Sequence, residues 1–212
     1  MRKEHFRRKV MKNCSKNYNW SLKCYLIIFI SKGTIIGVKK EVNCMNIQKF
    51  TQKSIEAINN CEKIAYDYGN QEIDQEHFLY SLMTIEDSLI ANLIEKMNID
   101  KDIFLKNIEQ LLNQKNKVSG DVKLYISNDL NKVLVNAEDE AKRMGDSYVS
   151  VEHLMLALIA APNRAIKQLF KTYGINRESF LSVLATVRGN QTVTSDNPEA
   201  TYDTLNKYAT DL

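Results

Sequence analysis

The stretch "DSYVSVEHLMLAL", Asp146–Leu158, has a counterpart 76 residues earlier in "NQEIDQEHFLYSL", Asn70–Leu82. Each stretch contains a Glu-His dipeptide followed by an apolar run. Sliding the chain by 76 residues aligns residues 50–113 with residues 126–189 without a gap, and 12 positions are identical. A gapless match of this length indicates an internal duplication. The body of the protein is therefore expected to be one structural unit present twice.

Composition favours helices in both halves. The 212 residues include only seven glycines and two prolines, which favours helix over a turn-rich β fold. In the first helix the apolar side chains recur at close to helical spacing. They predict a buried face made of Ile55, Ile58, Cys61, Ala65 and Tyr68.

Short polar residues that can accept a hydrogen bond from a free backbone N–H mark the helix starts. They are Thr51 and Ser127 for the first helix of each half, Asp74 and Ser150 for the second, and Asp100 and Asn176 for the fourth. The third helix is expected at about residues 88–96 and 164–172. We predict an all-α fold of two pseudo-symmetric four-helix repeats, about residues 50–113 and 126–189. The repeats pack as one domain, residues 45–189, with about eight helices.

The Glu-His pair in the opening stretch raises the question of catalysis or metal binding. Counted from a cap at Ser150, Glu152 takes the second helical position, where a negative charge suits the positive helix end. His153 takes the third position, from which its side chain can reach back to the cap. Glu76 and His77 occupy the same positions in the first repeat. We therefore predict no catalytic, cofactor-binding or metal-ligating residues, with a small enzyme using His153 and Glu152 as an alternative.

Charge divides the chain near residue 44. Residues 1–44 contain 11 Lys/Arg and 2 acidic residues, whereas the remainder contains 18 basic and 24 acidic residues. An acidic body is a poor ligand for a phosphate backbone, so no nucleic-acid partner is expected. The body contains a single cysteine, Cys61, so no intrachain disulfide can hold it together. This suits a reducing cytoplasm.

Residues 1–44 are expected to be a translated leader or a disordered extension. Their apolar run, residues 25–30 within "CYLIIFISKGTIIGV", is too short to span a bilayer, and no membrane partner is predicted. The residues "KKEVNCM" that end at Met45 can be encoded with the bacterial ribosome-binding sequence AAGGAGG upstream of the Met45 codon. Met45 is therefore the expected natural start, and a genuine extension or a targeting segment are the alternatives.

The duplicated pattern resembles the Clp N-terminal domain, in which two repeats of about 75 residues each carry a glycine and then Ile/Val-x-x-Glu-His-Leu/Phe. The tail "VRGNQTVTSDNPEATYDTLNKYATDL", residues 187–212, resembles the segment that leads into the first AAA+ motor of ClpB-type disaggregases. Residues 190–212 are accordingly expected to be a linker with a helix near its end, leading toward a motor domain. The resemblance covers residues 45–212.

The resemblance implies a non-enzymatic substrate-recognition module that binds exposed apolar segments of unfolded or aggregated proteins. Full-length relatives are hexameric ATPases that work with the DnaK chaperone system. This chain has no P-loop motif, so ATP binding, other cofactors and a hexamer are not expected of it, and the isolated chain is expected to be a monomer. Four residues are the candidates for substrate binding, from their places at the seam of the repeats and from the family. They are Thr51, Leu134, Asp146 and Glu152.

An alternative within the same fold is an adaptor-binding domain of a ClpC- or ClpA-type unfoldase that works with a protease. Those proteins share the repeats. The tail after residue 189 favours the ClpB type.

Overall fold

The computed structural model describes residues 47–118, 123–189, 192–194 and 196, all within one compact unit, residues 42–212. Eight α-helices lie in these ranges, as the sequence predicts. The first repeat contains η2 (Ile47–Lys49), α2 (Gln52–Asp67), β1 (Glu72–Ile73), α3 (Gln75–Thr84), α4 (Leu89–Lys96) and α5 (Lys101–Gln114). The second contains β2 (Tyr125–Ile126), α6 (Asn128–Met144), α7 (Val151–Ala160), α8 (Arg164–Tyr173) and α9 (Arg177–Arg188).

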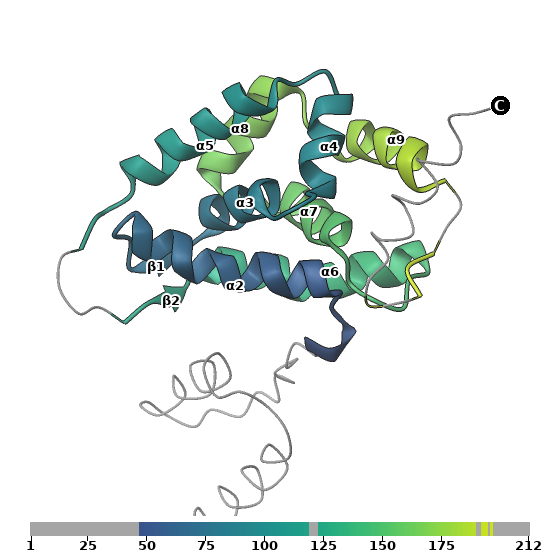
Figure 1. The fold of residues 1–212 in the computed structure, drawn as a ribbon, viewed down its shortest axis with the longest axis horizontal. Helices are drawn as coiled ribbons and strands as arrows, with labels where there is room; N and C mark the ends of the chain where they lie inside the picture. Colours follow the sequence, from purple (N-terminus) through teal and green to yellow (C-terminus); the bar gives the residue numbers. More distant parts are fainter. Residues whose placement is uncertain (1–46, 119–122, 190–191, 195, 197–212) are drawn as a thin grey trace, which may run out of the picture. The chain divides into compact units, whose positions relative to one another are not determined.

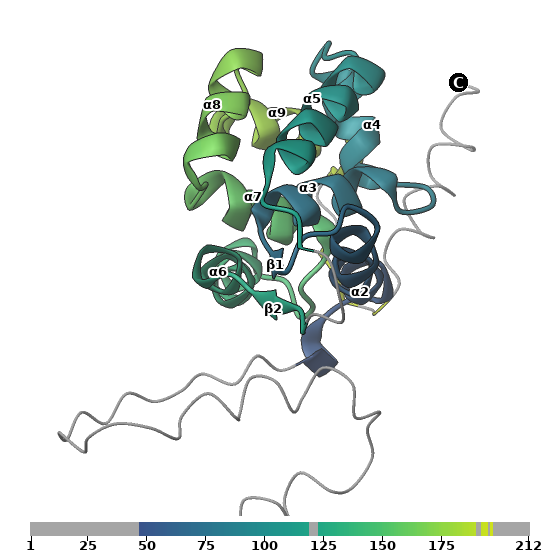
Figure 2. The ribbon, with the colours of Figure 1, turned by 90° about the vertical axis from the view of Figure 1, so that its left-hand side faces the viewer.

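The helices form three layers, with α3 and α7 in the middle (Figures 1 and 2). Helices α2 and α6 cover one side of this pair, and α4, α5, α8 and α9 cover the other. Eight of the ten residues of α3 and eight of the ten of α7 are buried. The middle layer explains why the segments after the two Glu-His dipeptides are apolar nearly all round.

The predicted caps are present. Thr51 and Ser127 accept hydrogen bonds from the backbone N–H groups of Ser54 and Leu130, as N-caps of α2 and α6. Asp74 and Ser150 begin α3 and α7, each with its histidine reaching back from the third position. Asp100 and Asn176 cap α5 and α9. Equivalent residues therefore begin equivalent helices, which confirms the duplication in three dimensions.

A crossed backbone ladder joins the two repeats. The β1 and β2 strands pair in parallel, with Ser127 N–H bonded to the carbonyl of Ile73 (2.8 Å). The equivalent residues pair in the same way, with Thr51 N–H bonded to the carbonyl of Val149 (3.0 Å). The segment before the first helix of each repeat is thus bonded to the segment before the second helix of the other. The sequence pattern predicted only helices and did not indicate this ladder.

One continuous core runs through both repeats and includes Phe78, Phe104 and Phe180, all fully buried. The expected inner face of α2 is partly wrong. Ser54, Ala57, Cys61, Ile64 and Ala65 are buried, whereas Ile55, Ile58 and Tyr68 are only partly buried. Small side chains allow close approach of α3, whose Ser81 hydroxyl donates to the carbonyl of Ala57 (2.7 Å). The predicted leader and the predicted linker helix lie outside the described residues.

Candidate functional site

A buried charge cluster lies at the start of α7; we call Asp146, Glu152, His153 and Arg188 the repeat-2 charge cluster. His153 Nδ1 accepts a hydrogen bond from the Ser150 backbone N–H (3.0 Å), so the ring proton is on Nε2, which donates to Asp146 (2.8 Å). Arg188, the last residue of α9, pairs through Nη2 with the second oxygen of Asp146. Arg188 Nη1 lies 3.7 Å from Glu152 Oε1. The side chains of Asp146, Glu152 and His153 are fully buried, and that of Arg188 is 5% exposed.

Asp146 stays ionised at the centre of this cluster. Burial disfavours its charge, but hydrogen bonds from His153, Arg188 and the Val193 backbone N–H outweigh burial and lower the pKa of Asp146 to about 2. Glu152 differs, because among the described residues neither of its oxygens has a hydrogen-bond partner, and its ion pair there is the one with Arg188. The cluster therefore depends on one guanidinium shared by two carboxylates.

At the equivalent position of the first repeat, the side chains around the histidine are different, with an amide and a lysine in place of a carboxylate and an arginine. We call Asn70, Asp74, Glu76, His77 and Lys115 the repeat-1 polar cluster. His77 Nδ1 accepts from the Asp74 backbone N–H (3.0 Å), so Nε2 donates to the amide oxygen of Asn70 (3.0 Å). Lys115 lies 2.8 Å from both Asp74 and Glu76 and is 21% exposed. Burial opposes the charge of Lys115, but these two hydrogen bonds prevail and raise its pKa. Burial and the nearby Lys115 lower the pKa of His77 to about 4.

The repeat-1 polar cluster also binds the second repeat. Asn163, the N-cap of α8, donates to Glu76 Oε1 (3.0 Å). The Ser127 hydroxyl donates to Asp74 Oδ1 (2.6 Å). Gln75 accepts from the Asn163 backbone N–H and donates to the Ala161 carbonyl (2.9 Å). This cluster is therefore a junction between the repeats, whereas the repeat-2 charge cluster joins α7 to α9 and the tail.

The side chains of the four predicted substrate-binding residues are all buried. Thr51 is fully buried, and its hydroxyl caps α2. Leu134 on α6 is 3% exposed and belongs to the continuous core. Asp146 and Glu152 share Arg188, and the backbone of Thr51 is bonded to Val149, three residues from each. The structure thus brings Thr51, Asp146 and Glu152 to one seam between the start of α2 and the α6–α7 loop.

Sequence reasoning missed Arg188 and Lys115. Arg188 stands where the repeat alignment places Leu112 in the first half, a fully buried core residue. A charged residue aligned with a core leucine was the available signal. Lys115 aligns with Gln191, and nothing in its polar sequence neighbourhood indicates that it reaches the partly buried Asp74 and the buried Glu76.

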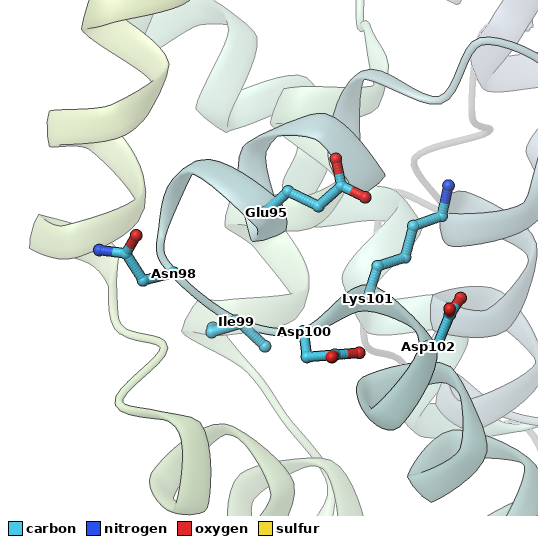
Figure 3. A pocket seen from close by; sticks show the side chains of 6 residues that line it. All are labelled: Glu95, Asn98, Ile99, Asp100, Lys101 and Asp102. Carbon is cyan, nitrogen blue, oxygen red and sulfur yellow. The ribbon is translucent and has the colours of Figure 1, made fainter.

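A polar hollow lies at the turn between the third and fourth helices of the first repeat. It is open to solvent and lies between α4 and α5, lined by Glu95, Asn98, Ile99, Asp100, Lys101 and Asp102 (Figure 3). Within the described ranges, no group of three or more His, Cys, Asp or Glu side chains is placed to hold a metal ion. None of the helices in the same ranges is long and apolar enough to cross a membrane.

The two buried Glu-His caps, the crossed ladder and the doubled four-helix unit define a duplicated helical module. The Clp repeat (R) N-terminal domain family matches residues 49–173, more than half of the chain, and the protein belongs to this family. The ClpB chaperone of Bacillus anthracis is 40% identical over 172 residues, which cover 79% of this chain and 20% of the relative. That of Clostridium tetani is 38% identical over the same shares. The chain thus spans about a fifth of the length of these chaperones.

Solved structures agree on the fold. The Hsp104 N-terminal domain from Candida albicans superposes with a TM-score of 0.60 at 23% identity and covers 70% of this chain and 97% of that domain. The ClpV N-domain in a complex with a VipB peptide has a TM-score of 0.56 at 17% identity, with coverages of 76% and 100%. At these identities the likeness shows the all-α Clp N-domain fold and no more.

Proposed function

We propose that this chain is the substrate-recognition domain of a ClpB-type disaggregase and binds exposed apolar segments of unfolded or aggregated proteins. The observation that carries the proposal is membership of the Clp repeat family together with the 40% identity to ClpB chaperones. The histidines of both Glu-His dipeptides are occupied by capping contacts, which supports a binding role over a catalytic one. The peptide complex of the related ClpV N-domain supports it as well.

The related ClpB chaperones are about five times as long as the part of them that this chain matches, and we extend the proposal to such a longer protein. As part of a chaperone with AAA+ motor domains, the module would work in a cytoplasmic hexamer together with the DnaK system. The chain itself contains no P-loop motif, so ATP hydrolysis would be supplied by those other domains.

The proposed client-binding region is the seam that contains Thr51, Asp146 and Glu152, and Leu134, a core residue of α6, is the fourth residue proposed to support it. Because these side chains are buried, they would act by fixing the backbone of the seam and its charge. Exposed neighbours such as Gln52 and Ser147 would then make the direct contacts. Capture of many different extended clients implies weak binding, about micromolar or weaker, because ordering a disordered chain costs free energy.

A titration of the ¹⁵N-labelled chain with a reduced, permanently unfolded polypeptide tests the proposal. We expect saturable binding, with amide shifts centred on Thr51, Asp146 and Glu152, and no binding of the same polypeptide in its folded, oxidised form. Equal binding of the two forms, or shifts that avoid the seam, would contradict it.

A further inference from the structure

The chain that follows α9 returns to the seam and is fastened there; we call residues 192–194 the tail strap. Val193 donates its backbone N–H to Asp146 Oδ1 (2.7 Å) and accepts at its carbonyl from the Ser147 backbone N–H (3.0 Å). Its side chain is fully buried, whereas Thr192 and Thr194 on either side are exposed. A little further on, the Asp196 carbonyl accepts from the Gln52 N–H at the start of α2 (2.9 Å).

Many proteins bind an extended peptide through the same kinds of contact that Val193 makes. Main-chain hydrogen bonds on both sides of one residue supply the affinity, and a pocket for alternate side chains supplies the selection. Here the pocket holds one valine side chain, and that side chain lies outside the continuous core of the domain. Removal of the tail strap would therefore leave the core complete and open a place for another extended segment.

The first repeat offers an internal reference. There the segment after α5 also pairs with the loop after the first helix, through an antiparallel bridge between Asn70 and Lys117. Lys117 aligns with Val193, but its side chain is exposed, and β2 follows within the domain. Backbone pairing at this place is thus common to both repeats, whereas the buried apolar side chain is found only at the second of these two positions.

We propose that the tail strap is a built-in ligand of an extended-peptide site formed by Asp146, Ser147 and the Val193 pocket, and that a client segment with an apolar residue displaces it. The inference rests on the proposed function and deepens it, because it names the subsite and its resident competitor. Client binding and strap binding then exclude one another, so a client that occupies the site releases the chain beyond α9. By linkage, whatever holds that chain in place weakens client binding by the same factor.

Two substitutions in the full chain test the competition. Val193→Asp places a carboxylate in the pocket beside Asp146 and should release the tail strap, and Val193→Ala should loosen it. If the strap is seated about nine-tenths of the time, its release strengthens client affinity about tenfold, since only the open fraction binds. We expect unfolded polypeptide to bind the aspartate variant about three- to ten-fold more tightly than the parent chain, with the alanine variant in between.

Thr194→Asp is the matched control, because it adds the same charge one residue away on an exposed side chain. It should bind clients as the parent does. Circular dichroism with thermal melts establishes that each variant is folded. Affinities that are unchanged or weaker in folded Val193 variants, while the parent binds clients, would overturn the competition and leave the proposed function standing. Failure of the parent and of every variant to bind would remove both.

Two further measurements examine the site directly. In the parent chain, the Val193 amide should lose its carboxylate-bonded position in a ¹H–¹⁵N spectrum as client is added. A free peptide "GNQTVTSDN", residues 189–197, should bind the Val193→Asp chain and shift the amides of Asp146 and Ser147. The peptide in which Asp replaces the valine should not bind. A Val193 amide that stays unmoved at client saturation, or a wild-type peptide that does not bind, would overturn the proposal.

Discussion

The repeat-1 polar cluster and the repeat-2 charge cluster begin from the same dipeptide and end as different structures. In both, the histidine caps its helix and donates a hydrogen bond from Nε2 to the residue seven positions earlier. That residue is Asn70 in one case and Asp146 in the other, and the balancing cation is a partly exposed lysine or a buried arginine. Both copies keep the cap and the fold. With different partners, one copy forms a junction between the repeats and the other a buried ion-pair site.

The largest expected effect follows from the shared guanidinium of the repeat-2 charge cluster. Arg188→Met leaves Asp146 and Glu152 buried without a cation, and removing one partner from a buried pair costs about 3–5 kcal/mol. Urea unfolding of the variant and the parent measures the loss.

Arg143→Met is the control for that experiment. Arg143 is 66% exposed, and its partner Glu140 keeps a second arginine, Arg177, at 2.8 Å. The control should cost less than about 1 kcal/mol, because Arg143 is exposed to solvent and Glu140 keeps its pair with Arg177. If Arg188→Met costs no more than the control, the buried ion pairs of Arg188 contribute no more to stability than the ion pair of the exposed Arg143.

Acid should affect the two clusters in separate pH ranges. His77 has a pKa of about 4 in the folded protein and about 6.5 in an unfolded chain, so the unfolded state binds more protons between these values. Stability is therefore full above about pH 6.5 and falls as the pH is lowered toward 4. Asp146, with its pKa of about 2, contributes stability that is lost only below about pH 4.

Unfolding free energies measured from pH 7 to pH 3 in the parent and in His77→Gln test this order. Glutamine does not titrate, so the slope between pH 6 and pH 4.5 should decrease by up to one proton, or about 1.4 kcal/mol per pH unit. An unchanged slope would show that His77 is not the group responsible.

The two histidines should also differ at neutral pH. A cap contact alone predicts a loss below about 1 kcal/mol for histidine to glutamine, because glutamine can reach back to the cap. His153 additionally donates to a fully buried carboxylate, so we expect His153→Gln to cost about 1–3 kcal/mol. His77→Gln, whose lost partner is the neutral amide of Asn70, should cost less in the same chemical denaturation assay. Equal losses of unfolding free energy in the two variants would mean that the hydrogen bond from His153 to Asp146 contributes no more to stability than the one from His77 to Asn70.

The smallest effect concerns the turns between the third and fourth helices. Asn98, at the turn between α4 and α5 (Figure 3), has a φ of 59°. Gly174 holds the equivalent place in the second repeat, with a φ of 67°. Glycine adopts this conformation without strain, so Asn98→Gly should stabilise the protein by up to about 1 kcal/mol. Asn92→Gly, an exposed change inside α4, should destabilise it by about as much, and thermal melts would show opposite shifts.

Local sequence rules predicted the helix starts because each depends on a side chain and a backbone a few residues away. Thr51, Asp74 and Ser150 illustrate this, as does the reach of His153 to its cap. The duplication in the sequence then predicted the arrangement of eight helices, because the same four-helix pattern occurs in both halves.

Contacts between distant residues were beyond those rules. The inner face of α2 was misassigned because close approach of α3 favours Ala57 over the larger Ile58. The sequence predicted that Asp146 and Glu152 lie near the start of one helix. Nothing near them in the sequence indicates that Arg188, 36 residues beyond Glu152, forms ion pairs with both. Val193, in a polar tail, likewise gave no sign of a fully buried side chain.

The crossed ladder has a consequence for synthesis of the protein. The Thr51 N–H finds its acceptor 98 residues later, at Val149, so the first repeat cannot complete its own edge while the second is still inside the ribosome. Pairings this distant in sequence carry a large loop-closure cost and are made late. The first repeat should therefore emerge from the ribosome as a partly ordered chain with an open strand edge, and both halves should become protease-resistant together once residue 149 is exposed.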